Sequence, residues 1–185
     1  MSQPDTALVL RAQAGDRAAF EELVRRSSRL VFARLYLETG CAHRAEDLLQ
    51  ETMLAAYRSL PRLAGPAGFR PWLLTIAHNA LVDAARRDGR RKRSPPAVVS
   101  LGDVPAPGPA PDEAAHRAEA RQRVLAALRS LPEDYRLPLA LRYLTGADYD
   151  AIGEQLGLTN GSLRGLLHRG LKLLRDRLPP ELAGE

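Results

Sequence analysis

The sequence predicts an all-α protein with two small helical domains joined by a Pro-rich linker. Hydrophobic residues make up 45% of the chain but aromatic residues only 5%, as in small helical bundles with Leu, Ala, Val and Ile cores. Apolar residues recur at spacings of three and four, whereas the alternation typical of strands is hardly seen. Six prolines interrupt this pattern over residues 94–115 and oppose helix there. We therefore expect domains at 1–93 and 116–185, with the linker at 94–115.

Three helices are expected in the first domain. Gly15 and Asp16 indicate a break followed by an N-cap, and Gly40 ends the long helix that follows. A second helix is expected at about 45–60, and a third opens at Pro71 and runs into the basic stretch RRDGRRKR. The inner side of the first helix is expected to carry Phe20, Leu23, Val24, Ser27, Leu30, Val31 and Leu35.

Four helices are expected in the second domain. They cover about 111–131, 133–144 (despite Pro138), 149–156 and 160–178. Only Gly157, Leu158 and Thr159 separate the last two, a spacing typical of a helix-turn-helix. Leucines at spacings of four and three form the inner face of the last helix, and small Gly153 should let another helix cross closely.

The outer face of the last helix is basic and suits the DNA major groove. It should expose Ser162, Arg164, Gly165, His168, Arg169 and Lys172. A plain helical hairpin with a solvated charged face is the alternative interpretation.

Residues 131–178, from LPEDY to RDRL, resemble region 4 of the extracytoplasmic function (ECF) sigma factors. The resemblance implies that the last helix recognises the upstream (−35) promoter element through Arg164 and Arg169, with Gly161, Ser162, His168 and Lys172 beside them. The sequence departs from the family pattern at several positions. Glycine stands at 153 and 170 where alanine is usual, Leu163 replaces valine, and Gly165 and Leu166 replace a Ser-Arg pair, which removes one expected DNA contact.

Residues 15–93 resemble region 2 of the same family, in the segments GDRAAFEELV, AEDLLQETML and GFRPWLLTIAHNALVDAARR. On the second segment Asp47, Gln50, Glu51 and Leu54 share one helical face, mixed acidic and apolar, that could meet a basic partner helix. The resemblance identifies that partner as the clamp helices of the polymerase β′ subunit. Ordinary solvated carboxylates are the alternative.

The resemblance places the non-template strand of the downstream (−10) element near Ala77, His78 and Asn79. A flipped base needs amide hydrogen bonds and apolar walls in exchange for lost stacking, and Asn79 suits this chemistry. Trp72 could stack on a base, but its place on the inner side of the helix favours packing in the core. The basic stretch RRDGRRKR should bind DNA phosphates. A basic tail that leads into the linker without binding DNA is the alternative. The candidates in this stretch are Arg86, Arg87, Arg90 and Arg91, continued by Lys92 and Arg93.

The net charge of +5 is compatible with a polyanionic partner, although a GC-rich genome also favours arginine. Four scattered histidines, one cysteine and the lack of a phosphate loop or nucleophile elbow argue against an enzyme, a metal centre or a cofactor. No secretion signal or membrane-length apolar run is seen, so a cytoplasmic protein is expected.

The expected partners are promoter DNA, core RNA polymerase through its β′ clamp helices and β flap, and an anti-sigma factor. A stand-alone DNA-binding regulator would explain the second domain but not the first. The linker of 22 residues spans at most ~75 Å. Two turns of DNA measure ~70 Å, so an extended linker could join domains on two such elements.

Overall fold

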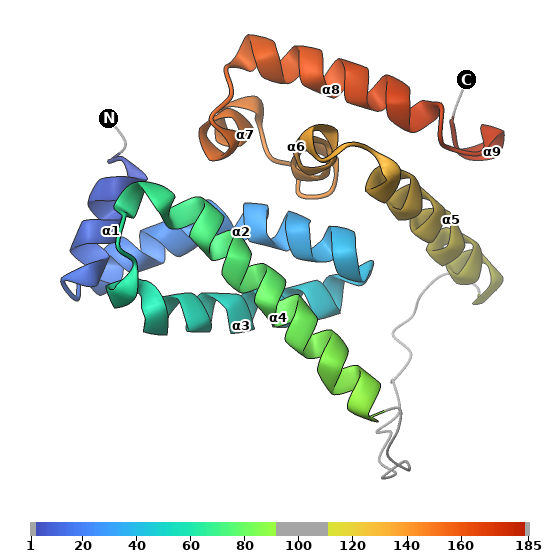
Figure 1. Ribbon diagram of the computed structural model, residues 1–185. Coiled ribbons are helices and arrows are strands. Elements are labelled where there is room, and N and C mark those ends of the chain that lie inside the picture. The colour runs from blue at the N-terminus through green and yellow to red at the C-terminus, as the bar shows by residue number, and fades with distance from the viewer. Residues whose placement is uncertain (1–2, 92–110, 184–185) are drawn as a thin grey trace.

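The computed structural model describes residues 3–91 and 111–183, apart from the side chains of 91, 111–115, 180 and 183. Within these ranges the chain forms helices and no strands, as predicted (Figure 1). The first unit contains α1 (Asp5–Gln13), α2 (Arg17–Thr39), α3 (Ala42–Ser59), the short 3₁₀ turns η1 (Leu60–Arg62) and η2 (Pro66–Gly68), and α4 (Phe69–Arg91). The second unit contains α5 (Pro111–Ser130), α6 (Glu133–Tyr143), α7 (Tyr149–Leu156), α8 (Asn160–Arg175) and α9 (Pro180–Ala183).

Local signals set both ends of α2, the longest helix of the first unit along with α4. The Asp16 carboxylate accepts the Ala19 N–H at 3.0 Å, and this bond, together with Arg11, lowers the pKa of Asp16. Gly40 ends the helix in the left-handed conformation, with φ of 67°, where a residue with a side chain would be strained. Both signals were expected from the sequence.

The core of the first unit lies between α1, α2, α3 and α4. Its fully buried members include Val9, Leu23, Val31, Leu35 and Leu73. Trp72 is partly buried and packs against this cluster, in agreement with the favoured core reading.

A second core contains residues from both units. Leu125, Leu131, Leu139, Ile152 and Leu163 come from the second unit, and Leu30, Ala33 and Leu37 join them from α2. The prediction of one inner face on α2 is therefore wrong in part, because Leu30 faces the second unit while Val31 and Leu35 face the first. Figure 1 shows α6 lying between α2 and α8.

Some boundaries differ from the expectation. Helix α5 begins at Pro111, so the last five residues of the expected linker are helical, while 94–110 lie outside the described residues. The short helices α1 and α9 were not anticipated. Helix α6 accommodates Pro138 in its interior, as expected.

Candidate nucleic-acid interface

Helices α7 and α8 form the predicted helix-turn-helix. Asp148 caps α7 by accepting the Ala151 N–H at 2.7 Å, and Gly157 ends that helix with φ of 67°. The Thr159 hydroxyl then accepts the Ser162 N–H at 3.2 Å and so caps α8. Side chains in the turn therefore satisfy backbone donors that the start of each helix leaves unpaired.

Two glycines allow the close packing of this motif. A Cβ atom at Gly153 would lie 2.7 Å from the Leu158 carbonyl oxygen, so the turn itself, and not a crossing helix as expected, approaches this residue. At Gly170 a Cβ atom would lie 3.1 Å from Leu139 Cδ1, and 3.2 Å from Tyr135 Cδ1, so α6 packs closely against α8. Both departures from the family pattern thus have a packing role in this chain.

The other side of α8 is open to solvent. The six DNA candidates are exposed, while the opposite side buries Leu163 and Leu167. Gly165, which was also expected on the exposed face, is only partly exposed. The exposed set is Gly161, Ser162, Arg164, His168, Arg169 and Lys172. No ion pair neutralises Arg164, Arg169 or Lys172 within the described parts of the chain.

Contacts with neighbouring side chains orient two of these six residues. The Arg164 guanidinium carbon lies 5.8 Å from the centre of the Tyr149 ring, which also contacts Arg142 at 5.0 Å. The Ser162 hydroxyl lies 3.0 Å from that of Thr159. Tyr149, at the start of α7, is a contributor that the sequence reasoning missed.

Helix α4 presents the candidates of the first unit. His78, Asn79, Arg86, Arg87 and Arg90 are exposed, and Ala77 is buried. The side chain of the further candidate Arg91, together with Lys92 and Arg93, lies outside the described residues. Asn79 lines a groove of about 540 Å³ with Arg87 and Glu51, which provides both amide and charged groups beside α4.

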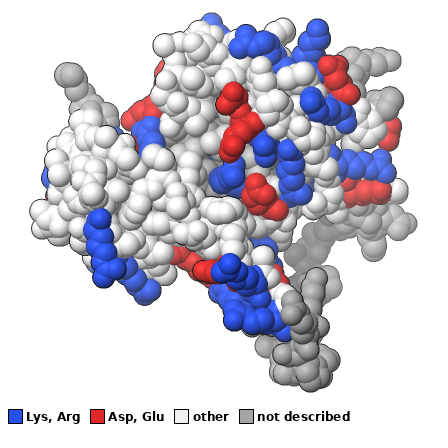
Figure 2. Space-filling model, in the orientation of Figure 1, with Lys and Arg blue, Asp and Glu red and all other residues white. Residues whose placement is uncertain are grey.

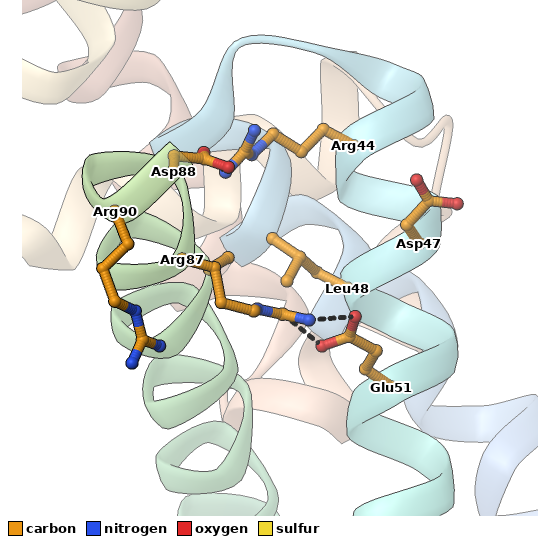
Figure 3. Close-up of a pocket in the computed structure, with 8 residues that line it drawn as sticks. Arg44, Asp47, Leu48, Glu51, Arg87, Asp88 and Arg90 are labelled. Carbon is orange, nitrogen blue, oxygen red and sulfur yellow. Dashed lines mark hydrogen bonds and ion pairs between the residues drawn. The ribbon is translucent and has the colours of Figure 1, made fainter. Parts of the chain in front are cut away.

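Ion pairs join the end of α4 to α3 (Figure 3). Arg87 donates to both carboxylate oxygens of Glu51, at 2.8 and 3.3 Å, and this pairing raises the pKa of Arg87. Arg44 on α3 pairs with Asp88 on α4. Arg90 points away from α3 and has no ion-pair partner among the described residues. Glu51, a predicted polymerase contact, therefore pairs with Arg87, a predicted DNA contact.

The four polymerase candidates on α3 are all exposed, but they occupy two sides of its outer face. Asp47 and Glu51 lie toward α4 and its arginines. Asp47 also lies 3.4 Å from the His43 imidazole, and its charge adds to a backbone hydrogen bond in raising the pKa of His43. Gln50 and Leu54 instead lie toward α2.

An apolar groove of about 780 Å³ separates α2 and α3. Leu54 and Tyr57 on α3 are 57% and 54% exposed, which is high for large apolar side chains beside each other on one helix. Across the groove lie Phe20 and Val24 of α2, whose predicted place was the inner helix face. Arg17, Glu21 and Arg25 form a charged rim.

The charge distribution on one face of the molecule follows these elements (Figure 2). Lys and Arg side chains gather at the end of α4, and further basic groups lie over the second unit. The part formed by α1 and its neighbours is largely uncharged in this view. In the described residues no helix is long and apolar enough to cross a membrane.

Comparison with known proteins agrees with this arrangement. Residues 23–91 match the family model Sigma-70 region 2, and residues 121–174 match Sigma-70, region 4. CarQ, an RNA polymerase sigma factor of Myxococcus xanthus, is 36% identical over 91% of this chain and 94% of its own. The ECF RNA polymerase sigma factor SigE of Mycolicibacterium smegmatis is 38% identical over 89% of this chain, which spans 64% of that relative. The chain belongs to the ECF RNA polymerase sigma factors.

Solved structures with a similar chain trace include two complexes. CnrH with the cytosolic domain of CnrY is 24% identical, covers 93% of this sigma factor and 95% of that chain, and has a TM-score of 0.46. RpoE with the anti-sigma factor NepR, from Bartonella quintana, is 23% identical over 84% of this sigma factor and 92% of that chain, with a TM-score of 0.41.

Family membership confirms the resemblance drawn from the sequence, and it gives this sigma factor its role in promoter-directed initiation of transcription by RNA polymerase. The roles of individual residues remain predictions. Sequence reasoning missed the groove residues Phe20, Val24, Met53 and Tyr57. Leu54 and Tyr57 stand three residues apart on the polar side of α3, and this pair of apolar residues could have indicated the groove from the sequence.

Proposed function

We propose that α8 reads the upstream promoter element with its exposed basic face. The observation that supports this most directly is the division of α8 into a buried leucine face and an exposed face of three cations that have no acidic partner in the described structure. Such cations can bind phosphates and guanine edges once they meet DNA. Arg164, held beside Tyr149, is the principal candidate for a base contact.

The first unit is proposed to bind the downstream element and the polymerase. Along α4, Asn79 and His78 would contact an unpaired strand, while Arg86, Arg87, Arg90 and Arg91 would contact phosphates. The groove between α2 and α3 would receive a clamp helix of the β′ subunit. Leu54 and Tyr57 offer exposed apolar area there, and Gln50 offers a polar group. Asp47 and Glu51, on the side of α3 toward α4, would contact basic residues of the same partner.

Two further features complete the proposal. The chain carries out no catalysis itself, since nucleotide addition belongs to the polymerase, and it acts in the cytoplasm. The β flap is the expected polymerase contact of the second unit. An anti-sigma factor is proposed as a further partner that inhibits this chain.

Run-off transcription from a promoter library, with and without core polymerase, tests this function. Transcripts are expected only when both proteins are present. Arg164→Ala should reduce use of promoters that depend on the upstream element, while co-purification with core stays unchanged. Arg121→Ala, an exposed arginine on α5, is the matched control and should leave both unchanged. Transcription by this chain without core, or none with it, contradicts the proposal.

A further inference from the structure

Arg164 differs from the other exposed cations of α8 because an aromatic side chain holds it. Its guanidinium carbon lies 5.8 Å from the centre of the Tyr149 ring, within the range of a cation–π contact. No hydrogen bond or ion pair joins the Arg164 side chain to another residue in the described parts of the chain. The Tyr149 ring is therefore the contact that restricts where this long side chain can point.

An aromatic contact leaves the hydrogen-bond donors of an arginine available. The face of the ring attracts the positive charge, but it does not pair with the five guanidinium N–H groups as a carboxylate would. Arg87 shows the contrast, because it donates to both carboxylate oxygens of Glu51. The Arg164 side chain is thus held in place while its N–H groups stay free to bind a partner.

Tyr149 is itself fixed by the fold. It is the first residue of α7, and it packs partly buried against the core of the second unit. A second guanidinium, that of Arg142 on α6, lies 5.0 Å from the ring centre and donates to the Ala147 carbonyl oxygen at 3.1 Å. The ring therefore connects α6, α7 and α8, and its position is defined before DNA binds.

The acidic side chains beside this ring have other partners. The Asp148 carboxylate accepts the Ala151 N–H at 2.7 Å, and the Asp150 carboxylate accepts a hydrogen bond from the Asn160 amide at 2.8 Å. Neither carboxylate forms an ion pair with Arg164 in the described structure. The charge of Arg164 therefore remains available to an electronegative group, such as the O6 and N7 edge of a guanine.

We infer that Tyr149 is a positioning residue that presents the Arg164 guanidinium to a guanine of the upstream element. This inference rests on the proposed function of α8. Arginine reads guanine by donating to O6 and N7 together, which requires one orientation of the planar guanidinium. Holding that orientation before DNA binds lowers the cost of ordering the side chain. Gly165 and Leu166 remove one expected contact, so discrimination depends more on the arginines that remain.

Sequencing the promoters that the holoenzyme binds measures this discrimination. Core polymerase with this chain is given a promoter library in which the upstream element is randomised, and the base preference is determined at each position. Arg164→Ala identifies the position that Arg164 reads. There Tyr149→Leu should reduce the preference for guanine by roughly two- to fivefold, the size of one exposed cation–π contact. The position identified with Arg169→Ala, about 7.5 Å further along α8, should keep its preference.

Three outcomes separate positioning from a direct contact and from a packing role. Tyr149→Phe keeps the ring and should keep the guanine preference. Its loss in that variant would mean that the hydroxyl group itself contacts DNA, which would overturn the inference. Equal losses at all upstream positions in Tyr149→Leu would show a packing role and would also overturn it. Tyr143→Leu, at a tyrosine of α6 that is 59% exposed, is the matched control and should change no preference.

A double variant keeps the test decisive even where Tyr149→Leu loosens α7. In the Arg164→Ala background, Tyr149→Leu should cause no further loss at the position that Arg164 reads, because the ring acts through that side chain. Losses of the same size in both backgrounds would overturn the inference. An Arg164→Ala variant with unchanged base preferences would contradict the proposed function together with the inference. A change in Arg164→Ala but none in Tyr149→Leu would contradict the inference alone.

Discussion

Alanine at Gly153 should destabilise the helix-turn-helix, although alanine is the better helix former. The gain in helix propensity is about 1 kcal/mol. Against it, the new Cβ atom would lie 2.7 Å from the Leu158 carbonyl oxygen, which must move by about 0.7 Å to reach ordinary contact. That carbonyl belongs to a turn held by the hydrogen bond from the Leu158 N–H to the Gly153 carbonyl, at 2.9 Å. Overpacking of this kind costs roughly 1–3 kcal/mol. We expect a net loss of about 1 kcal/mol.

Gly165→Ala is the matched comparison on the neighbouring helix. There the added Cβ atom would lie 3.3 Å from Nη1 of Arg169, the end of a flexible side chain that can move aside. The propensity gain should therefore remain, and Gly165→Ala should stabilise the chain by about 0.5–1 kcal/mol. The two variants add the same methyl group to helical glycines and should have effects of opposite sign.

Urea denaturation followed by circular dichroism measures the two free energies of unfolding, and hydrogen exchange of the α7 and α8 amides shows whether the change is local. For a chain of this size 1 kcal/mol corresponds to roughly 2–4 °C in melting temperature. Equal stabilisation by both alanines would refute the reasoning. It would mean that the turn moves freely and that Gly153 has no packing role.

Three further predictions follow from other contacts. Glu51→Gln removes the partner of Arg87, so the free chain should bind DNA more tightly and with a salt slope larger by up to about one, measured by fluorescence titration; an unchanged slope contradicts this. Leu163→Ala should lower the free energy of unfolding by about 2–5 kcal/mol, because Leu163 is fully buried. Hydrogen bonds from Arg25 and then Arg26 lower the pKa of Glu22 from 4.5 to about 2. Its stabilising contribution is therefore complete above pH 4.5 and lost as the pH falls toward 2, and Glu22→Gln should reduce the acid sensitivity of melting.

Local signals in the sequence were sufficient for the helix-turn-helix. Asp148 and Gly157 define α7 by their own capping chemistry, and the leucine spacing of α8 separates its buried side from its exposed side. Helix α1 was missed because only Leu8 and Val9 are buried in its nine residues, too few to give a periodic pattern. Capping residues and apolar spacing can therefore predict a helix from one segment, provided that the segment buries enough residues to show the spacing.

Contacts between segments could not be predicted in the same way. Spacing indicates which residues share a face of α2, but not that Leu30 and Val31 pack against different units. The pairing of Glu51 with Arg87 and the groove between α2 and α3 depend on how neighbouring helices are rotated, which side-chain packing decides. The exposure of the predicted site residues followed from the sequence, whereas their partners did not.

The two sides of α6 differ in how readily they could separate. On one side Gly170 lets α8 pack closely against Tyr135 and Leu139 of α6. These two helices are also close in sequence, because only α7 and short turns separate them. On the other side α6 meets α2, and the covalent path between these helices runs through residues 92–110. Separation of α6 from α8 would expose the buried face of the reading helix, whereas separation from α2 would leave it intact. The contact of α6 with α8 is thus the one on which the DNA-facing geometry of α8 depends.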